Sequence, residues 1–363
     1  MIKQLKKFTV QVVSGANIAT ILIMLLAGFS DHFDPVCHPR LAMLGLIFPL
    51  FVLINFGFLI FWLIFKPRRA IIPVMGFVCG YSPIRRFLPL NVGREIPEEA
   101  IKLITYNVKH FAYDEYKDEN NPVLQYLINQ KADIVCIQEM GCNKNLRQLS
   151  DSMLATVYPY HETMRSNSKE SDLLGIYTRY PILKTELIEY ESKGNVSAAF
   201  HLLVDGDTVI VLNNHLQSIG YSEDDKDAFN HIIKGETNKE YAQVESRRIV
   251  DKYQQALVQR YSQVDSVLNY IDKNAGYSMI VCGDFNDGPI SYTRRMLARN
   301  LVDCFVESGT GLGITYHRKR FYVRIDHIFC SNDWLPFKCV VDNEIKDSDH
   351  YPVICWLKKR PNP

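Results

Sequence analysis

The chain has 363 residues, 47% of them hydrophobic and 22% charged, and a formal net charge of +1. This length can hold one large domain with additional segments. The small net charge conceals an asymmetry, because residues 1–96 carry 10 basic and 3 acidic side chains, whereas residues 97–363 carry 31 and 37. The acidic second part argues against broad nucleic-acid binding, since proteins that grip long DNA usually present a basic face.

Two long uncharged segments lie near the N-terminus, at residues 8–29 and 41–65. Each is long enough to cross a bilayer as a helix. No small-residue cleavage pattern follows the first segment, which argues against a secretory signal peptide. We therefore predict that residues 1–96 form a membrane anchor, that the bilayer is a partner of this protein, and that its location is the cell membrane with more than one crossing.

A shorter apolar stretch at residues 70–81 leaves the number of crossings open. Extended to residue 90 it predicts a third span, and otherwise it predicts a helix lying on the membrane surface. Basic residues lie before the first span and at residues 66–69, and they favour a cytoplasmic position for the N-terminus and for the segment 66–69. Two spans then place the rest of the chain in the cytoplasm, and three place it outside. Arg85 and Arg86 argue against a third crossing.

From residue 97 onward, short apolar strands alternate with helices. The patterns predict helices that begin at Pro122 and that cover residues 146–154 and 244–271. Residues 222–241 are polar and charged, and we predict a mobile loop there. Predicted strands cover residues 101–106, 133–138, 173–178, 198–204, 208–213 and 279–282.

Polar side chains of a few types recur at the ends of these strands. Asn107, Glu139 and His215 end three of them, and Asp284 and Asn286 follow a fourth. Residues two apart at a strand end point the same way, so these last two can converge on one point. Carboxylate and amide oxygens suit a hard divalent cation such as Mg²⁺, while His and Asp can transfer protons. The pattern predicts a metal-assisted hydrolase.

Six short motifs in this part of the chain resemble those of the endonuclease/exonuclease/phosphatase superfamily, which includes deoxyribonuclease I. In chain order they are TYNV, IQE, NNHL, GDFND, RIDHI and SDHYPV. The resemblance covers about residues 101–357 and, with the apolar N-terminus, is to a membrane-anchored bacterial member. It implies an α+β fold: a four-layer α/β sandwich of two packed β-sheets flanked by helices, at residues 97–363, preceded by N-terminal transmembrane helices.

The resemblance also implies roles for individual residues. Asn107, Glu139 and Asp349 are expected to bind Mg²⁺, for which Mn²⁺ could substitute. Asp284 is expected to activate a water and Asp326 to orient His350. The remaining implied roles are stabilisation of charge by His350 and contacts with the phosphate from His215 and Asn286.

The expected function is that of a membrane-anchored, metal-dependent phosphoester hydrolase in which an activated water attacks in line. Nucleic acid, a phospholipid headgroup and a small phosphoester all remain open as the substrate, and no motif indicates a protein partner. The alternative is an inactive membrane-bound scaffold or receptor for a phosphorylated ligand. The complete set of motifs favours the enzyme, because degenerate binders usually lose a site residue.

Nine cysteines are scattered along the chain without a CxxC pair. Several lie in apolar strand-like runs, so we predict buried free thiols that pack as small hydrophobic side chains, and not a zinc site or a disulfide framework. This use of cysteine fits a reducing compartment slightly better than an oxidising one.

Overall fold

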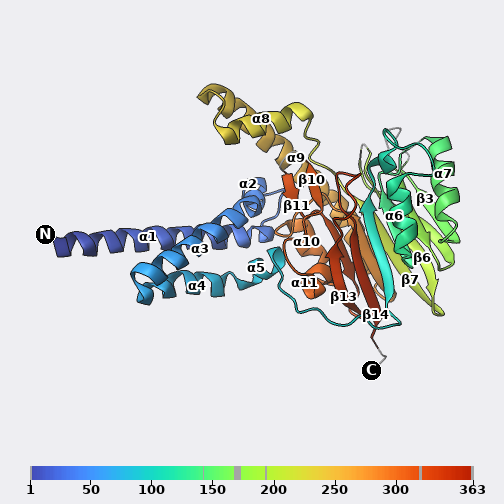
Figure 1. Ribbon diagram of the computed structural model, residues 1–363, viewed down its shortest axis with the longest axis horizontal. Coiled ribbons are helices and arrows are strands. Elements are labelled where there is room, and N and C mark those ends of the chain that lie inside the picture. Colours follow the sequence, from blue (N-terminus) through green and yellow to red (C-terminus); the bar gives the residue numbers. More distant parts are fainter. Residues whose placement is uncertain (1, 142, 167–172, 193, 319–320, 361–363) are drawn as a thin grey trace.

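The computed structural model describes residues 2–141, 143–166, 173–192, 194–318 and 321–360. Two six-stranded mixed sheets pack against each other, helices flank them, and an N-terminal helical region extends away from this sandwich (Figure 1). The α+β class and the layered arrangement predicted from the sequence are thereby confirmed.

The first sheet has the strand order β13-β14-β1-β2-β4-β3. β1 runs parallel to β2 and antiparallel to β14. Its strands are β1 (Ile101–Asn107), β2 (Ile134–Gln138), β3 (Tyr160–Met164), β4 (Leu174–Thr178), β13 (Trp334–Val341) and β14 (Val353–Lys359).

The second sheet has the order β5-β6-β7-β8-β12-β9. β7 runs parallel to β8, and β12 runs antiparallel to β8. Its strands are β5 (Ile182–Ile188), β6 (Val196–Val204), β7 (Asp207–His215), β8 (Ser278–Asp284), β9 (Val302–Asp303) and β12 (Asp326–Cys330). A separate pair, β10 (Tyr316–Arg318) and β11 (Phe321–Val323), lies outside both sheets.

Successive side chains along each strand point to opposite faces of the sheet, and those on the inner faces fill the space between the two sheets. Leu103 of β1 joins the core between the sheets, whereas its neighbour Ile104 packs on the outer side against α6. Both faces of the central strands are therefore apolar, as expected for sheets covered on both sides. α6 (Pro122–Gln130) and α7 (Lys144–Leu154) cover the first sheet, while α9 (Lys239–Lys273) and α10 (Tyr292–Leu297) cover the second.

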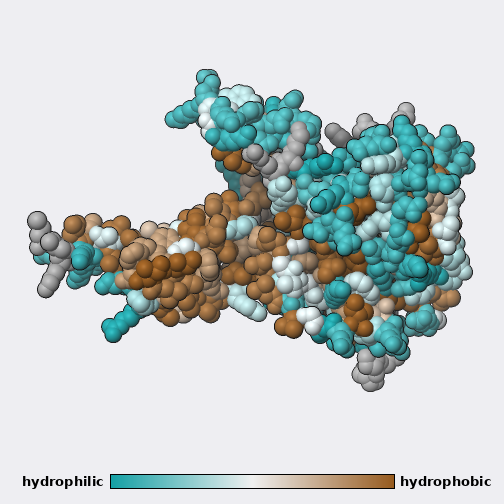
Figure 2. Space-filling view, in the orientation of Figure 1, coloured by the Kyte–Doolittle hydropathy of each residue, from teal (hydrophilic) through white to brown (hydrophobic). Residues whose placement is uncertain are grey.

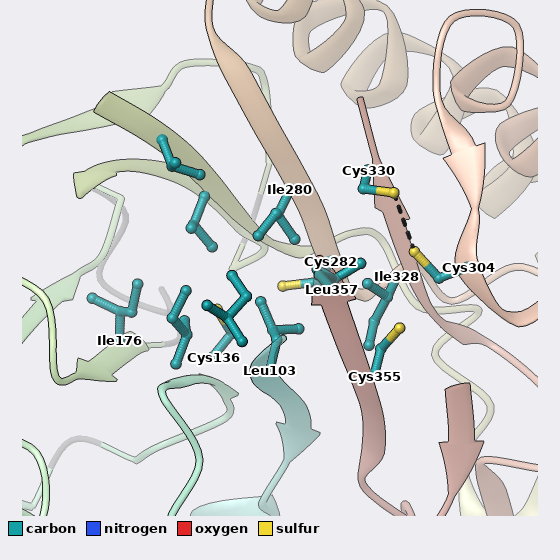
Figure 3. Close-up of a cluster of buried hydrophobic side chains, with 14 of the residues drawn as sticks. Leu103, Cys136, Ile176, Ile280, Cys282, Cys304, Ile328, Cys330, Cys355 and Leu357 are labelled. Carbon is teal, nitrogen blue, oxygen red and sulfur yellow. Dashed lines mark hydrogen bonds between the residues drawn. The ribbon is translucent and has the colours of Figure 1, made fainter. Parts of the chain in front are cut away.

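The cysteines of the sandwich pack in this core as the sequence predicts. Figure 3 shows five of them among aliphatic side chains, with Cys304 and Cys330 side by side and their sulfurs 3.6 Å apart. Cys37 and Cys79 are exposed, and Cys142 lies outside the described residues. The buried free thiols are Cys136, Cys282, Cys304, Cys330, Cys339 and Cys355.

The prediction of a mobile loop at residues 222–241 is wrong. This segment forms α8 (Glu223–Lys234) and the start of α9. The signals for the helix are a capping box, in which Ser222 and Asp225 satisfy each other's backbone amides, and Gly235, which ends the helix in a left-handed conformation. α8 packs on the β10–β11 pair through Phe229, whose ring centroid lies 4.9 Å from that of Phe321.

The N-terminal region consists of α1 (Ile2–Gly28), α3 (Phe48–Phe65), α4 (Ile71–Cys79) and α5 (Tyr81–Phe87), with the short α2 (Pro39–Ala42) between α1 and α3. Two helical segments, Gln4–His32 and Pro39–Phe65, are long and apolar enough to cross a membrane. The space-filling view shows apolar residues over most of this region, in contrast to the hydrophilic surface of the sandwich (Figure 2).

Gly283, one residue before the end of β8, requires the absence of a side chain. Its φ is +131°, and a Cβ at this position would lie 2.0 Å from the backbone oxygen of Asn214 on β7. Gly283→Ala is therefore expected to destabilise the fold by at least about 2 kcal/mol, through backbone strain and steric overlap. Thermal unfolding measures the loss. Gly276→Ala is the matched control, because no described atom lies within 4 Å of a Cβ there, and an equal effect of both variants would contradict the prediction.

Candidate active site and metal centre

One end of the sandwich gathers the polar residues that the strands carry. Because β7 and β8 are parallel, His215 and Asp284 stand opposite each other at their carboxyl ends. β12 runs the other way, which places Asp326, its first residue, opposite Asp284. The parallel pair β1–β2 brings Asn107 and the residue after β2, Glu139, to the same end. The two sheets thus contribute side chains to a single site.

Glu139, His215 and Asp284 form the first half of this site. His215 Nε2 lies 3.6 Å from Glu139 Oε1 and 3.9 Å from Asp284 Oδ2. Asn107 bridges the two carboxylates, since its Nδ2 donates to Glu139 Oε1 (2.9 Å) and to Asp284 Oδ2 (3.1 Å). Glu139 has a left-handed backbone, with φ of 54°. Such strained conformations concentrate at functional sites, where surrounding structure holds them in place.

Asp284, Asp326 and His350 form the second half. His350 Nδ1 lies 2.8 Å from Asp326 Oδ2, and Nε2 lies 3.6 Å from Asp284 Oδ2. Burial alone would lower the pKa of His350, but the charges of Asp326 and Asp284 outweigh it and raise that pKa to about 10. Burial, and then the charge of Asp326, raises the pKa of Asp284. The imidazole is therefore held protonated, beside a carboxylate that takes up a proton more readily than an exposed one.

Asp326→Asn is expected to lower the pKa of His350, because the variant removes the closest negative charge from the imidazolium. The protonated fraction of His350 above pH 7 then falls. NMR titration of the imidazole in metal-free protein measures this change. Asp205→Asn, in the exposed turn between β6 and β7, is the control. An unchanged pKa in the Asp326 variant would show that this carboxylate does not hold the proton on His350.

The donor atoms of this site could hold a metal ion. They form two overlapping clusters, Glu139–His215–Asp284 and Asp284–Asp326–His350, within each of which the ligating atoms lie within 4.8 Å of one another. Asp326 Oδ1 is buried and has no hydrogen-bond partner among the described atoms, as expected beside an ion or a water. Carboxylate oxygens and imidazole nitrogens are common metal ligands, so the donor set fits a divalent cation.

Two residues expected at the site are placed at its edge. Asp349 lies in neither of the two clusters found among the described residues, and its Oδ2 lies 3.4 Å from Lys109 Nζ. Asn286 donates its side-chain amide to the backbone oxygen of Leu216 (2.9 Å), and its backbone amide donates to Asp284 Oδ1 (2.9 Å). In this structure Asn286 therefore orients the carboxylate of Asp284.

The structure adds neighbours that the motifs do not include. Thr315 Oγ1 accepts hydrogen bonds from the backbone amides of Ile325 and Asp326, which fixes the start of β12. The ring of Tyr316 packs edge-on against His350, with centroids 5.2 Å apart. Lys226 of α8 reaches the hydroxyl of Tyr316 at 3.4 Å. The sequence does not predict these contacts, because residues 311–316 have no motif of their own and the polar composition of residues 222–241 predicts a loop in place of α8.

A profile described as the Endonuclease/Exonuclease/phosphatase family matches residues 104–350. The fold and the site define a phosphoesterase of this class, and the chain belongs to that family. A second match, over residues 10–87, is to a domain of unknown function, DUF8431. No curated protein matches the chain.

Among the solved structures similar to this chain are three that cover 72% of it, each with a TM-score of 0.52. One is D. rerio TDP2 humanized by 14 mutations, at 15% identity and covering 99% of that chain. Another is D. rerio TDP2 complexed with a single-strand DNA product, at 14% identity and covering 100% of that chain. The third is an endonuclease/exonuclease/phosphatase from Beutenbergia cavernae, at 16% identity and 72% coverage of that chain. At these identities the likeness concerns the fold.

Proposed function

We propose that this protein is a membrane-anchored phosphoester hydrolase that depends on Mg²⁺, with Mn²⁺ as a substitute. The observation that carries the proposal is the convergence of five acidic and histidine side chains at one end of the sandwich, with His350 and Asp326 2.8 Å apart. An inactive scaffold would have no need for this costly concentration of buried charge.

Each residue of the site has a role in hydrolysis. Glu139 and Asn107, together with Asp349, would hold the metal ion, which when bound supplies positive charge to a phosphate oxygen. Asp284 orients the attacking water and accepts its proton, a task that its raised pKa favours. Protonated His350, kept in place by Asp326, stabilises the negative charge that develops on the phosphate. His215 contacts the phosphate from the side of Glu139.

The proposed substrate is a phosphoester of a lipid headgroup or of a small molecule. The net charge of −6 over residues 97–363, from 31 basic and 37 acidic side chains, supports this choice over long nucleic acid. A membrane anchor would also keep the enzyme beside lipids. The DNA product in the D. rerio structure is a reason to test DNA as well.

The test is a substrate panel with the purified full chain in detergent. It contains bis-p-nitrophenyl phosphate, sphingomyelin, phosphoinositides, RNA and plasmid DNA, each with Mg²⁺ or Mn²⁺. We expect hydrolysis of the nitrophenyl ester and of one lipid class, and at least about 100-fold slower hydrolysis of both by an Asp284→Asn variant. Hydrolysis of DNA in preference to lipid would contradict the proposed substrate. Failure to hydrolyse any phosphoester would favour the scaffold.

A membrane anchor at residues 1–96 completes the proposal. Large apolar side chains remain exposed on α1 and α3, including Leu22, Leu53, Phe56 and Ile64. An exposed apolar surface of this kind is unfavourable in water and is typical of a surface that meets lipid. The anchor and the catalytic domain at residues 97–363 are therefore proposed as the two functional parts of the chain.

A further inference from the structure

The segment from Arg69 to the end of α5 lies along α1 and the turn that follows α1. Contacts along this length join residues that are 55 to 58 positions apart in the chain. They include Ser14 with Arg69, Ile21 with Gly76, Met24 with Gly80, Gly28 with Pro83 and Arg86, and Asp31 with Arg86. A nearly constant offset arises only between segments that run in the same direction, so α4–α5 is parallel to α1 over the length between Ser14 and Asp31.

α3, which lies between α1 and α4 in the sequence, runs in the opposite direction to both α1 and the segment α4–α5. Asn17 contacts Trp62, with Trp62 Nε1 donating to Asn17 Oδ1 at 3.1 Å, and further along α1 a Cβ on Gly28 would meet Phe48 at 2.7 Å. Residue numbers thus fall along α3 as they rise along α1, which makes the two helices antiparallel. The chain therefore passes along the same length three times, and Figure 1 shows the three segments side by side.

The polar groups inside this bundle satisfy one another. Asn17 Nδ2 donates to Asn55 Oδ1 (2.9 Å), Thr20 Oγ1 donates to the same oxygen (3.1 Å), and Asn55 Nδ2 donates to the backbone oxygen of Phe51 (2.8 Å). Paired polar residues facing a bundle interior are what a lipid environment requires. Apolar side chains of α4, such as Ile71 and Val78, remain exposed on the outside.

We propose that the chain crosses the bilayer three times, with α4–α5 as the third crossing, and that the catalytic domain lies on the side opposite to the cytoplasm. This inference rests on the membrane anchor proposed above. The charges set the direction. The start of α1 and the connection between α3 and α4 lie at the end of the bundle far from the catalytic domain. Together they carry six basic and no acidic residues: Lys3, Lys6, Lys7, Lys66, Arg68 and Arg69. Basic loops of this kind stay in the cytoplasm.

The connection between α1 and α3 lies on the same side as the catalytic domain. A Cβ on Gly45 would lie 2.3 Å from the backbone oxygen of Ile290, so this connection packs directly on the catalytic domain. Ala42 packs with Tyr253 and Leu257 of α9. The C-terminal end of α1 and the domain therefore share one side, and the basic N-terminus lies on the other.

Arg85 and Arg86, which argued against a third crossing in the sequence, have partners at the domain end of α5. Arg85 pairs with Glu307 of the catalytic domain at 3.1 Å, and Arg86 pairs with buried Asp31. Arg324 also donates a hydrogen bond to the backbone oxygen of Arg86. Because acidic partners compensate these two charges, they no longer oppose a position outside the cytoplasm.

The free cysteines of the catalytic domain are compatible with a position of this domain outside the cytoplasm. The six described cysteines of the sandwich, Cys136, Cys282, Cys304, Cys330, Cys339 and Cys355, are all buried. Oxidation of a thiol requires access to the sulfur, so buried structural cysteines are unreactive. Their presence in reduced form is therefore compatible with an oxidising compartment as well as with a reducing one.

Labelling with a membrane-impermeant maleimide tests the topology on the full chain. Native Cys37, exposed in the α1–α3 connection, reports on one loop. In a Cys37→Ser background, Arg68→Cys reports on the opposite loop, and Ser152→Cys, exposed on α7, reports on the catalytic domain. Cys37→Ser alone measures labelling at the other cysteines. We expect Cys37 and Ser152→Cys to be labelled in intact cells, and Arg68→Cys only after permeabilisation.

Each of the other outcomes would overturn a different part of the proposed topology. Labelling of Cys37 alone in intact cells would leave two crossings and a cytoplasmic domain. Labelling of Arg68→Cys alone would reverse the orientation but keep the three crossings. Labelling of all three sites, or of none even after permeabilisation, would contradict the three-pass bundle. Recovery of the chain in the soluble fraction would overturn the anchor itself, whereas phosphoester hydrolysis by the purified chain is measured separately.

Discussion

Replacing Asp284 by asparagine is expected to lower kcat for bis-p-nitrophenyl phosphate by about 100- to 10,000-fold, the usual contribution of a general base. Asparagine has nearly the same shape but cannot accept a proton from water. Its side-chain oxygen can still accept the hydrogen bond that the Asn286 backbone amide donates to Asp284 Oδ1 (2.9 Å). The geometry of the site is therefore expected to persist while turnover is lost.

Stability separates loss of chemistry from loss of fold. Asp284 is buried and its charge is repelled by that of Asp326, which raises its pKa. Removing the charge relieves this repulsion, so the melting temperature of metal-free Asp284→Asn is expected to equal or exceed that of the wild type. Asp205→Asn, in an exposed turn, is the matched control and should keep full activity. Retained turnover in Asp284→Asn would mean that another group activates the water.

Removal of divalent cations with EDTA is expected to abolish hydrolysis, and added Mg²⁺ to restore it. The carboxylates of Glu139 and Asp284 both lie within 4 Å of His215 Nε2, and a cation between such groups would offset their mutual repulsion. Measurement of initial rates against Mg²⁺ concentration gives the apparent affinity for the metal. Activity that survives thorough chelation would exclude the metal-dependent mechanism.

Glu139→Gln refines this test, because it removes one charge from the proposed metal site. Changes around metal ligands typically weaken metal affinity by about 10- to 100-fold, so the Mg²⁺ concentration for half-maximal rate should rise by at least about 10-fold. Glu98→Gln, an exposed substitution in the segment before β1, should leave it unchanged. An unaltered Mg²⁺ dependence in Glu139→Gln would assign the metal to the second cluster, around Asp326 and His350.

The strand ends were the most predictable part of this molecule. A short apolar run followed by Asn107, Glu139 or Asp284 fixes both the strand and the side of the sheet at which it ends, because buried strands tolerate polar side chains only at their ends. The long α9 was equally clear from its apolar repeat. These local signals sufficed to predict that one site collects side chains from several strands.

Contacts made by segments without a local signal could not be predicted. Tyr316 meets His350 only because an isolated bridge pairs these two residues across 34 positions of sequence, and nothing in the intervening residues specifies that pairing. α8 did carry a signal, the capping box at Ser222, but its polar composition concealed it. The direction of α4–α5 likewise depends on contacts with α1, which apolar composition alone does not determine.

Polar contacts fix the N-terminal helices to the sandwich, which has a consequence for the proposed membrane-anchored hydrolase. Arg86 is held by Asp31 and by Arg324, and Asn91 donates to the backbone oxygens of Val306 and Gly309. On the proposed membrane anchor, a domain joined by a flexible linker would vary its distance from the bilayer, whereas one held by these contacts would keep a single distance and orientation. The proposed hydrolase would then reach only phosphoesters at that distance from the bilayer.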